Sequence, residues 1–424
     1  MTALMHLYII ITMLGFVRQL GVLAVVSGTV HCGFIGYESR TWPGTDTGQQ
    51  AVMPVVESDA NGSIPSGTPT SDAIGTLGDA DIPSGPAPYR LGECAETAFS
   101  GAHFPWELDF SLTTLGDGRV LLLGGQSGSE FVDQAELFIP STGEWDTLPP
   151  MPFAVGEHTA TYIPEHNAVL VTGGGHGFLS ARDHAALLDV STRSWHEVEP
   201  MAFARVRHRA TRLASGQILV CGGSFDAPTD AARSCQRFIA TSASTGAWGP
   251  AADLPEGRYN HVQHRLQDGS VLVTHGMAIS SAASSRYLPG SDAWEPLPNS
   301  ATWAEGHLSV LLHDGSVLIT GGWHHVDGSL RRTKRFDGAT EQWEELPDAP
   351  RTAIDTHAHK TARLADGRVV FEHNMHFDST SDTWELVPEP SHEACVALHD
   401  EAAVFCVGGD DVDRAHSGRI TCAR

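Results

Sequence analysis

Basic residues are scarce in this chain of 424 residues. It contains 26 lysines and arginines against 51 aspartates and glutamates, and every basic residue except Lys334 and Lys360 is an arginine. With a formal net charge of −25, the protein has no electrostatic attraction for phosphate backbones, which argues against binding to nucleic acid. The same acidity favours solubility and requires no ligand to explain it.

Motifs that would indicate catalysis or a metal site are also missing. The sequence has no Cys-x-x-Cys pair and no cysteine and histidine spacing typical of structural zinc. It lacks the Gly-x-Ser-x-Gly motif of serine hydrolases and the repeated Ser-x-Asp-x-Gly-x-x-Trp box of sialidases. We therefore predict no metal site and no cofactor, and we name no catalytic residue.

The N-terminal 31 residues are apolar apart from an interruption at Arg18 and Gln19, and no acidic residue occurs before Glu38. Residues 1–31 therefore predict an export signal. A membrane-spanning signal anchor is the alternative, although the interruption leaves fewer than the roughly 20 apolar residues that a span requires. Cys32 lies where bacterial lipoproteins carry their lipidated cysteine, but His31 replaces the small residue expected before it, so lipidation stays open.

Residues 32–90 have the composition of a tether. From Thr41 to Pro88 the chain is rich in Gly, Pro, Ser, Thr and Asp, and it contains no Lys or Arg. Such a segment cannot bury enough apolar surface to fold, so we predict a disordered tether that holds residues 91–424 away from a membrane or wall. We expect an exported protein that is secreted, periplasmic or anchored to the cell envelope, with membrane contact through the N-terminus only.

One pattern recurs through the rest of the chain at intervals of about 50 residues. A bulky residue precedes a tryptophan by seven positions, or by ten in one case, with turn-forming residues between them. The pairs are Phe138/Trp145, Leu188/Trp195, Phe238/Trp248, Tyr287/Trp294, Phe336/Trp343 and Phe377/Trp384. Each pair predicts a hairpin in which the two bulky side chains meet across the strands.

A second hairpin is predicted upstream of each pair, at turn dipeptides such as Asp117-Gly118 and Asp314-Gly315. Its second strand is a continuous apolar run, which predicts burial on both faces. In most repeats this strand ends in Gly-Gly, as at Gly173-Gly174, which suits a crowded point where modules meet. The repeat therefore contains four short antiparallel strands.

Four such strands form the blade of a β-propeller, and Gly-Gly followed by an aromatic residue and a Trp resembles the kelch repeat. The resemblance extends from about Leu108 to Cys422. It implies an all-β fold, a kelch-type β-propeller of seven four-stranded blades, with six as the fallback. The seventh repeat starts at His392 and lacks one strand, and an open edge would expose unpaired backbone. We therefore predict that an N-terminal strand within residues 91–106 completes the last blade.

Six cysteines besides Cys32 lie in the folded part and divide into pairs by position. One pair flanks a hairpin, one joins the end of a strand to the start of the next, and one lies at the two ends of the propeller. The predicted disulfides are Cys395–Cys406, Cys221–Cys235 and Cys94–Cys422. They would agree with an oxidising compartment, whereas buried reduced thiols are the alternative.

Histidines occupy one register at the start of each first strand: His158, His208, His261, His307, His357 and His392. In a propeller this position lies near the central channel, so a ring of imidazoles could bind metal or respond to pH. A residue that recurs in every blade more simply solves the same packing problem in each blade. We favour this structural interpretation.

A second group of residues follows the second strands, in loops of variable length where a repetitive scaffold normally carries its specificity. Trp323 could stack on a sugar ring or a peptide side chain, or pack within its loop. With two arginines at the channel mouth, the predicted binding residues are His176, Trp323, His324, His325, Arg207 and Arg258.

The leading hypothesis is a monomeric, exported propeller that binds a protein or carbohydrate ligand through loops on one face, without catalysis. The alternative is a sugar-active enzyme at the channel mouth, as the resemblance implies through sugar mutarotases and galactose oxidase, although no motif matches the copper ligands of galactose oxidase. A deep pocket with converging Arg, Glu and His side chains would favour the enzyme. A shallow face lined with Trp and Phe would favour binding.

Overall fold

The computed structural model describes residues 94–99, 109–127, 130–175, 180–223, 232–278, 284–299, 305–324, 327–352, 361–371, 375–386, 394–397, 403–407 and 417–422. The chain divides into two compact units, Met1–Pro83 and Ser84–Arg424, and every described residue belongs to the second. The predicted export signal, Cys32 and the tether lie outside the described residues. No helix in the described part of the chain is long and apolar enough to cross a membrane.

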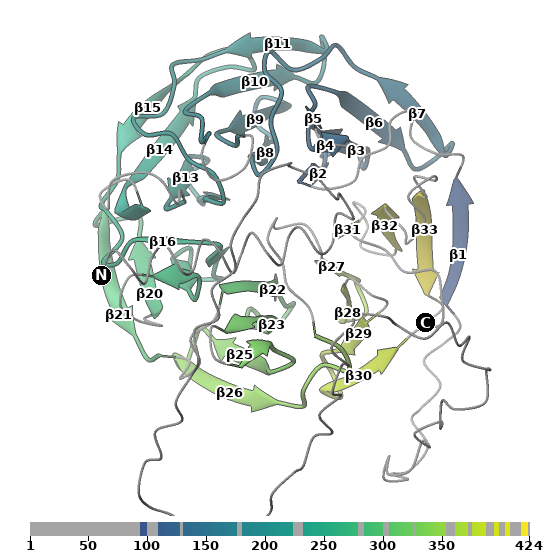
Figure 1. The fold of residues 1–424 in the computed structure, drawn as a ribbon, viewed down its shortest axis with the longest axis vertical. Coiled ribbons are helices and arrows are strands. Elements are labelled where there is room, and N and C mark those ends of the chain that lie inside the picture. Colours follow the sequence, from purple (N-terminus) through teal and green to yellow (C-terminus); the bar gives the residue numbers. More distant parts are fainter. Residues whose placement is uncertain are drawn as a thin grey trace, which may run out of the picture. The chain divides into compact units, whose positions relative to one another are not determined.

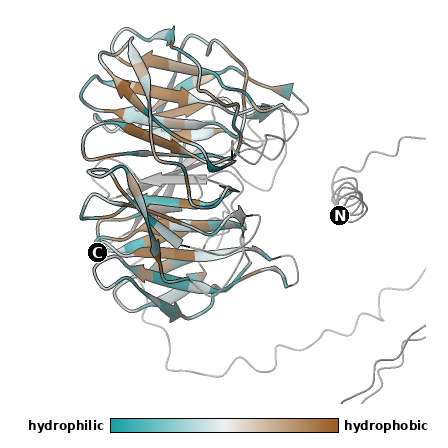
Figure 2. Ribbon diagram, turned by 90° about the vertical axis from the view of Figure 1, so that its left-hand side faces the viewer, coloured by the Kyte–Doolittle hydropathy of each residue, from teal (hydrophilic) through white to brown (hydrophobic). Residues whose placement is uncertain are grey.

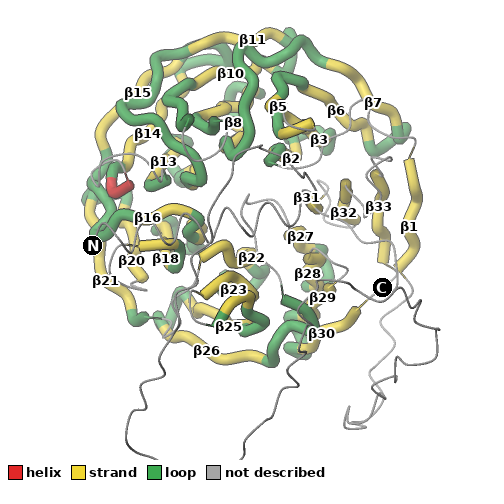
Figure 3. The backbone as a smooth tube through the Cα atoms, in the orientation of Figure 1, coloured by secondary structure: helices red, strands yellow, loops and turns green. Residues whose placement is uncertain are grey.

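The second unit is a ring of four-stranded antiparallel sheets (Figure 1). Within the described ranges, helical residues are limited to Ala232 and Arg233 (Figure 3). Six of the sheets each come from one continuous stretch of chain, and we number these blades in chain order.

The strands of these six blades are given from the axis outward. Blades one and two contain β2 (Ser111–Thr114), β3 (Val120–Leu123), β6 (Ala135–Ile139) and β7 (Glu144–Thr147), then β8 (Thr159–Ile163), β9 (Ala168–Thr172), β10 (Ala185–Asp189) and β11 (Ser194–Glu197). Blades three and four contain β12 (Arg209–Arg212), β13 (Ile218–Cys221), β14 (Cys235–Ala240) and β15 (Gly246–Pro250), then β17 (Val262–Arg265), β18 (Val271–Thr274), β20 (Ser284–Leu288) and β21 (Ala293–Leu297). Blades five and six contain β22 (Glu305–Leu311), β23 (Val317–His324), β25 (Thr333–Asp337) and β26 (Gln342–Leu346), then β27 (Thr361–Arg363), β28 (Arg368–Phe371), β29 (Met375–Asp378) and β30 (Thr383–Leu386).

Five short strands lie in the connections between the second and third strands or before a first strand. They are β4 (Gln126–Ser127) paired with β5 (Glu130–Phe131), β16 (Arg258–Tyr259) paired with β19 (Met277–Ala278), and β24 (Gly328–Ser329) paired with β23.

The seventh four-stranded sheet joins the two ends of the unit. It contains β31 (Ala394–Ala397), β32 (Ala403–Val407), β33 (Ser417–Cys422) and, outermost, β1 (Cys94–Phe99). The innermost strands contact one another all the way round, from β2 through β8, β12, β17, β22, β27 and β31 back to β2. The structure thus confirms a propeller whose last blade is completed by an N-terminal strand, so that β33 is not left as an open edge.

The hydrophobic core lies between neighbouring blades. The second strands β3, β9, β13, β18 and β28 are buried along their whole length, as their continuous apolar runs predicted. Leu121 and Leu123 of β3 join Val169 and Val171 of β9 in one cluster. Figure 2 shows hydrophobic residues concentrated in the strands and hydrophilic residues in many of the connections. A strand covered on both faces has no exposed side, which explains why its sequence does not alternate.

Each predicted pair of a bulky residue and a tryptophan forms across the third and fourth strands, for example Phe336 opposite Trp343 with ring centroids 5.1 Å apart. The indole then reaches the preceding blade, where its N–H donates to a backbone carbonyl oxygen. These bonds join Trp195 to Pro149 (2.9 Å), Trp248 to Glu199 (2.7 Å), Trp294 to Ala252 (2.9 Å), Trp343 to Pro298 (2.9 Å) and Trp384 to Pro347 (3.0 Å). The tryptophan repeat therefore closes a hairpin and links two blades at once.

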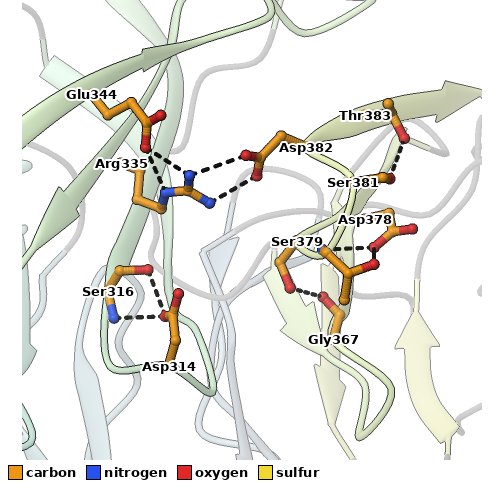
Figure 4. A network of polar contacts seen from close by, with 11 residues as sticks. Asp314, Ser316, Arg335, Glu344, Gly367, Asp378, Ser379, Ser381, Asp382 and Thr383 are labelled. Carbon is orange, nitrogen blue, oxygen red and sulfur yellow. Dashed lines mark hydrogen bonds and ion pairs between the residues drawn. The ribbon is translucent and has the colours of Figure 1, made fainter.

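Arginines of the third strands also link neighbouring blades. Arg335 of β25 donates to Glu344 of β26 (2.6 Å) and, across to blade six, to both carboxylate oxygens of Asp382 (2.8 and 3.0 Å), as Figure 4 shows. Asp382 has a φ of 54° in the turn between β29 and β30. The equivalent contacts in two other blade pairs are Arg237 with Asp292 (3.4 Å) and Arg286 with Glu341 (2.8 Å).

Of the predicted disulfides, Cys221–Cys235 is present and links β13 to β14. Cys406 is disulfide-bonded, and Cys395 is its register partner across β31 and β32. Cys94 and Cys422 are likewise direct partners in the register of β1 and β33. The side chains of Cys94, Cys395 and Cys422 lie outside the described part of the structure, so these two bridges stay predictions.

Candidate functional site

The predicted histidine register and the variable loops belong to the same face of the ring. Strands alternate in direction within a blade, so the start of the first strand lies at the same end as the connection between the second and third strands. The pairing of β16 with β19 and the bridge between Gly156 and Gly175 join these two regions directly. We call this end the loop face, and we call the opposite end, which carries the Asp-Gly turns, the turn face.

A chain of backbone hydrogen bonds runs from blade to blade on the loop face, just before the innermost strands. Five residues there have positive φ angles, namely Asp109 (65°), Glu157 (54°), Arg207 (55°), Asn260 (50°) and Gly306 (63°). The N–H of each of the last four donates to the carbonyl oxygen of the equivalent residue one blade earlier, over 3.1 to 3.4 Å. Because this left-handed backbone is disfavoured for most side chains, the blade-to-blade bonds must hold it in place.

The side chains beside this backbone chain form a polar group that we call the axial cluster, made of Glu157, Arg207, Asn260 and Glu305. Arg207 Nε donates to Glu157 Oε1 at 2.7 Å, with 14% of the arginine side chain and 3% of the glutamate side chain exposed. Asn260 Nδ2 makes a long hydrogen bond of 3.5 Å to Glu305 Oε2. Asn260 is 2% exposed, and its Oδ1 has no hydrogen-bond partner.

Glu305 is the carboxyl group of the cluster whose titration is altered most clearly. Burial raises the pKa of Glu305 above its ordinary value, although the hydrogen bond from Asn260 and the positive charge of Arg207 act in the opposite direction. Because the pKa is raised overall, the effect of removal from water exceeds the combined effects of Asn260 and Arg207. An additional positive charge or hydrogen-bond donor beside such a carboxyl group would stabilise its ionised form.

Trp323 lies directly opposite Glu305 in the register of β22 and β23. Directly opposite residues in an antiparallel pair have Cβ atoms about 5 Å apart, so the register places Trp323 and Glu305 side by side on the two strands. Trp323 is half-buried, and β23 continues past it to pair with β24. His324 follows, and its Nδ1 lies 3.0 Å from Asp327 Oδ2. Of the predicted loop residues, His176 and His325 lie outside the described residues.

Arg258, also predicted as a binding residue, is part of the blade frame. Only 1% of it is exposed, and its Nη1 donates to the carbonyl oxygen of His275 at 3.1 Å. Burial lowers its pKa to about 10. Arg205 makes the equivalent contact one blade earlier, to the carbonyl oxygen of Gly222 at 2.7 Å. The structure therefore brings Arg207, but not Arg258, together with the residues of the axial cluster.

The described register histidines, His158, His208, His261 and His307, are all buried. Their rings fit against the glycine pairs of two blades. A Cβ added to Gly173 or Gly222 would lie 2.7 or 2.8 Å from the Cε1 of the histidine in the following blade, His208 or His261. The Nε2 atoms of His158 and His208 lie 2.8 Å from Ser111 Oγ and 3.0 Å from Thr159 Oγ1.

Burial lowers the pKa of His208 and His261 well below the ordinary value and that of His307 to about 3. Neutral, enclosed imidazoles support the structural interpretation of this register. His357 and His392 lie outside the described residues. By strand register with blade five, the sequence position equivalent to His307 is His359, two residues after the predicted His357.

The binding residues predicted from the sequence include Arg207 and Trp323 but not Glu157, Asn260 and Glu305, which the structure places beside them. The available signal was position, because Glu157 and Asn260 directly precede a register histidine and Glu305 stands two residues before one. Their varied side chains at a constant position were the mark of a site on a repeated frame.

The ring of sheets with its interlocking tryptophans and glycine pairs defines the class of protein as a β-propeller. The family model that describes the Kelch motif matches residues 113–152, which cover β2, β3, β6 and β7 of blade one. The protein is a kelch-repeat β-propeller.

Among solved structures, the chain is similar to a novel fungal alcohol oxidase with catalytic diversity among the AA5 family, in complex with copper. The two are 16% identical with a TM-score of 0.58, over 78% of this chain and 76% of that one, a likeness that shows the fold alone. A comparison with curated proteins finds no match. No group of three or more His, Cys, Asp or Glu in the described ranges is placed to hold a metal ion.

Proposed function

We propose that this kelch-repeat propeller is an exported scaffold that binds a protein or glycan ligand on its loop face. The observation that carries the proposal is the contrast between a repeated frame and a loop face whose described side chains differ from blade to blade, as at Glu157, Arg207 and Asn260. On that face the axial cluster lies close to Trp323, where β23 pairs with β24. Specificity normally resides in such variable positions on a rigid scaffold.

Aromatic side chains on the loop face also favour a binding surface. Phe203 is 38% exposed, with the Arg205 guanidinium 6.0 Å from its ring centre. Phe131 lies close to Gly156, where an added Cβ would come within 2.4 Å of its ring. The exposed Phe203 and the half-buried Trp323 favour binding, since aromatic residues are enriched where proteins recognise ligands.

Export is the second part of the proposal, and the protein would be secreted, periplasmic or attached through its N-terminus. The apolar residues 1–31 support this part, as does the Cys221–Cys235 disulfide, because such bonds persist in oxidising compartments. We propose that it acts as a monomer.

The test is a screen of the full-length protein on protein and glycan arrays, repeated with two variants. Trp323→Ala alters the loop face, whereas Gln217→Ala alters the turn face and serves as the matched control. We expect Trp323→Ala to lower the affinity for the captured ligand by roughly tenfold or more. Gln217→Ala should leave this affinity unchanged. The proposal would be overturned if the Gln217→Ala variant no longer bound the ligand while the Trp323→Ala variant still did.

A sugar-active enzyme at the axis, mutarotase-like or galactose-oxidase-like, is the second candidate. It is supported by Glu305, whose pKa is raised by burial and which lies in the same cluster as Arg207, since a raised pKa makes a carboxyl group a better general base and acid. Polarimetry of freshly dissolved aldoses, and peroxide release from primary alcohols with copper supplied, test the two reactions. Activity in the wild type that Glu305→Gln abolishes would support this candidate, and an inactive wild type would overturn it.

A further inference from the structure

We propose that Glu305, Asn260 and Trp323 form a recognition site for a single cationic group, the guanidinium of an arginine or the ammonium of a lysine presented by a protein ligand. The inference rests on the proposed binding function and specifies the chemistry that the loop face recognises.

The first support is the amide of Asn260. Its Nδ2 points to Glu305, its Oδ1 has no hydrogen-bond partner, and the residue is 98% removed from solvent. A buried carbonyl oxygen without a donor typically costs about 1–3 kcal/mol. A guanidinium or ammonium brings several N–H donors into a small volume, so it can bond to this oxygen and to the adjacent carboxylate together.

The second support is the charge balance around Glu305. Arg207 pairs with Glu157 at 2.7 Å, so its single charge is shared between Glu157 and Glu305. Asn260 contributes no charge, and the axial cluster therefore holds two carboxylates against one arginine. A cation bound at Glu305 would restore neutrality inside a partly desolvated site, where electrostatic interactions are stronger than in water.

The third support is Trp323, which lies directly opposite Glu305 in the register of β22 and β23. The face of an indole attracts a cation within about 6 Å, and the attraction grows when water is excluded. An aromatic wall beside a carboxylate and an amide oxygen is a combination that suits a positively charged head group on an apolar stem.

The net charge of the whole chain favours the same kind of ligand. At −25 the protein attracts cationic ligands and repels anionic ones before contact. A neutral sugar could satisfy the free oxygen of Asn260 but would leave the excess negative charge of the cluster unbalanced. We therefore argue for a basic side chain and treat a glycan as an outcome of the test.

The experiment measures binding of short capped peptides to the full-length protein by calorimetry and ligand-observed NMR. The probe is acetyl-Gly-Gly-Arg-Gly-Gly-amide, and its control replaces arginine by citrulline, which has nearly the same shape without the charge. We expect the arginine peptide to bind at least tenfold more tightly than the citrulline peptide, and Glu305→Gln to remove this difference. Glu197→Gln deletes a charge from the exposed outer strand β11 and should leave the difference unchanged.

Two further variants keep the test decisive if Glu305→Gln folds poorly. Trp323→Leu should weaken the arginine peptide several-fold, and Asn260→Asp should strengthen it, because aspartate tolerates the positive φ of 50° and adds a negative charge. Equal binding of the arginine and citrulline peptides, or a Glu305→Gln variant that still discriminates between them, would overturn the cationic site. Competition by a neutral oligosaccharide alone would assign the site to a glycan. In both cases the proposed binding on the loop face would still hold if Trp323→Ala abolished binding of the ligand found on the arrays.

Discussion

Gly173 shows why a glycine pair and a histidine recur together in this sequence. Its φ of 62° lies in the left-handed region, and an added Cβ would meet the carbonyl oxygen of Arg205 and the His208 ring, both at 2.7 Å. A Cβ added to the following Gly174 would lie 2.9 Å from the Cβ of His158 in the same blade. Glycine is therefore required by conformation and by space, and the histidine ring fills the space that glycine leaves.

Replacement of this glycine tests the tightness of the contact. We expect Gly173→Ala to lower the free energy of unfolding by about 2 kcal/mol or more, since strain at positive φ adds to the overlap. Gly290→Ala is the matched control, because nothing lies within 4 Å of its added Cβ. Denaturant unfolding of both variants measures the difference, and equal stabilities would show that the blades can move apart at Gly173.

At the scale of the strand and hairpin, two kinds of contact join neighbouring blades, and their environments differ. The indole N–H of Trp343 donates to the carbonyl oxygen of Pro298 at 2.9 Å and packs on Phe336. The Arg335–Asp382 ion pair has 18% of the arginine and 33% of the aspartate side chain exposed. Exposed ion pairs contribute roughly 0–1 kcal/mol. A hydrogen bond typically contributes about 0.5–1.5 kcal/mol, and the indole adds its packing on Phe336.

We therefore expect the tryptophan contact to matter more than the ion pair. Trp343→Phe keeps an aromatic ring but removes the N–H donor and part of the packing on Phe336, and it should cost about 1–2 kcal/mol. Asp382→Asn keeps the shape and tolerates the positive φ, and it should cost less than about 1 kcal/mol, with the loss shrinking at high salt. Thermal unfolding at two salt concentrations separates the two. A larger loss for Asp382→Asn would reverse this ranking.

The hairpins could be predicted from the sequence because turns, strands and paired aromatic residues are encoded within each repeat of the chain. The apolar run of β3 and the Phe336 and Trp343 pair are local signals of this kind. The axial cluster could not be predicted in this way, because Asn260 and Glu305 meet only when blades four and five pack together. Arg258 shows the opposite failure, since a charged residue near a first strand suggested a ligand contact and instead bonds to a backbone carbonyl. The sequence carries no local mark that distinguishes these two uses of arginine.

At the scale of the whole ring, buried histidines link stability to pH. Burial lowers the pKa of His264 to about 4 and of His307 to about 3, and it lowers those of His208, His261 and His275 below the ordinary value. Between pH 6.5 and these lowered values the unfolded chain binds protons that the folded chain does not. Stability is therefore fully present above about pH 6.5 and falls as the pH decreases, by up to about 1.4 kcal/mol per pH unit for each such histidine.

We expect the midpoint of denaturant unfolding to fall steadily from pH 7 to pH 4.5. His264→Gln should reduce the number of protons taken up on unfolding by about one. Glutamine can keep the hydrogen bond to Ser309 Oγ, which is 2.9 Å long in the wild type, without titrating. The slope of unfolding free energy against pH gives the number of protons taken up. An unchanged slope in the variant would mean that His264 is protonated in the folded protein.

Closure of the ring depends on β1, which lies far from β33 in sequence and pairs with it from Cys94↔Cys422 to Phe99↔Ser417. Removal of residues 1–83 leaves every strand of the ring in place, whereas removal of residues 1–100 exposes the backbone of β33 as an open edge. Such an edge pairs with other chains, so we expect the longer truncation to melt at lower temperature and to aggregate, while the shorter one stays monomeric. Size-exclusion chromatography and thermal unfolding of the two truncations make the comparison at equal concentration. If the longer truncation matched the shorter one in size and melting temperature, the three strands β31, β32 and β33 would suffice as a blade, and the ring would not need its N-terminal strand.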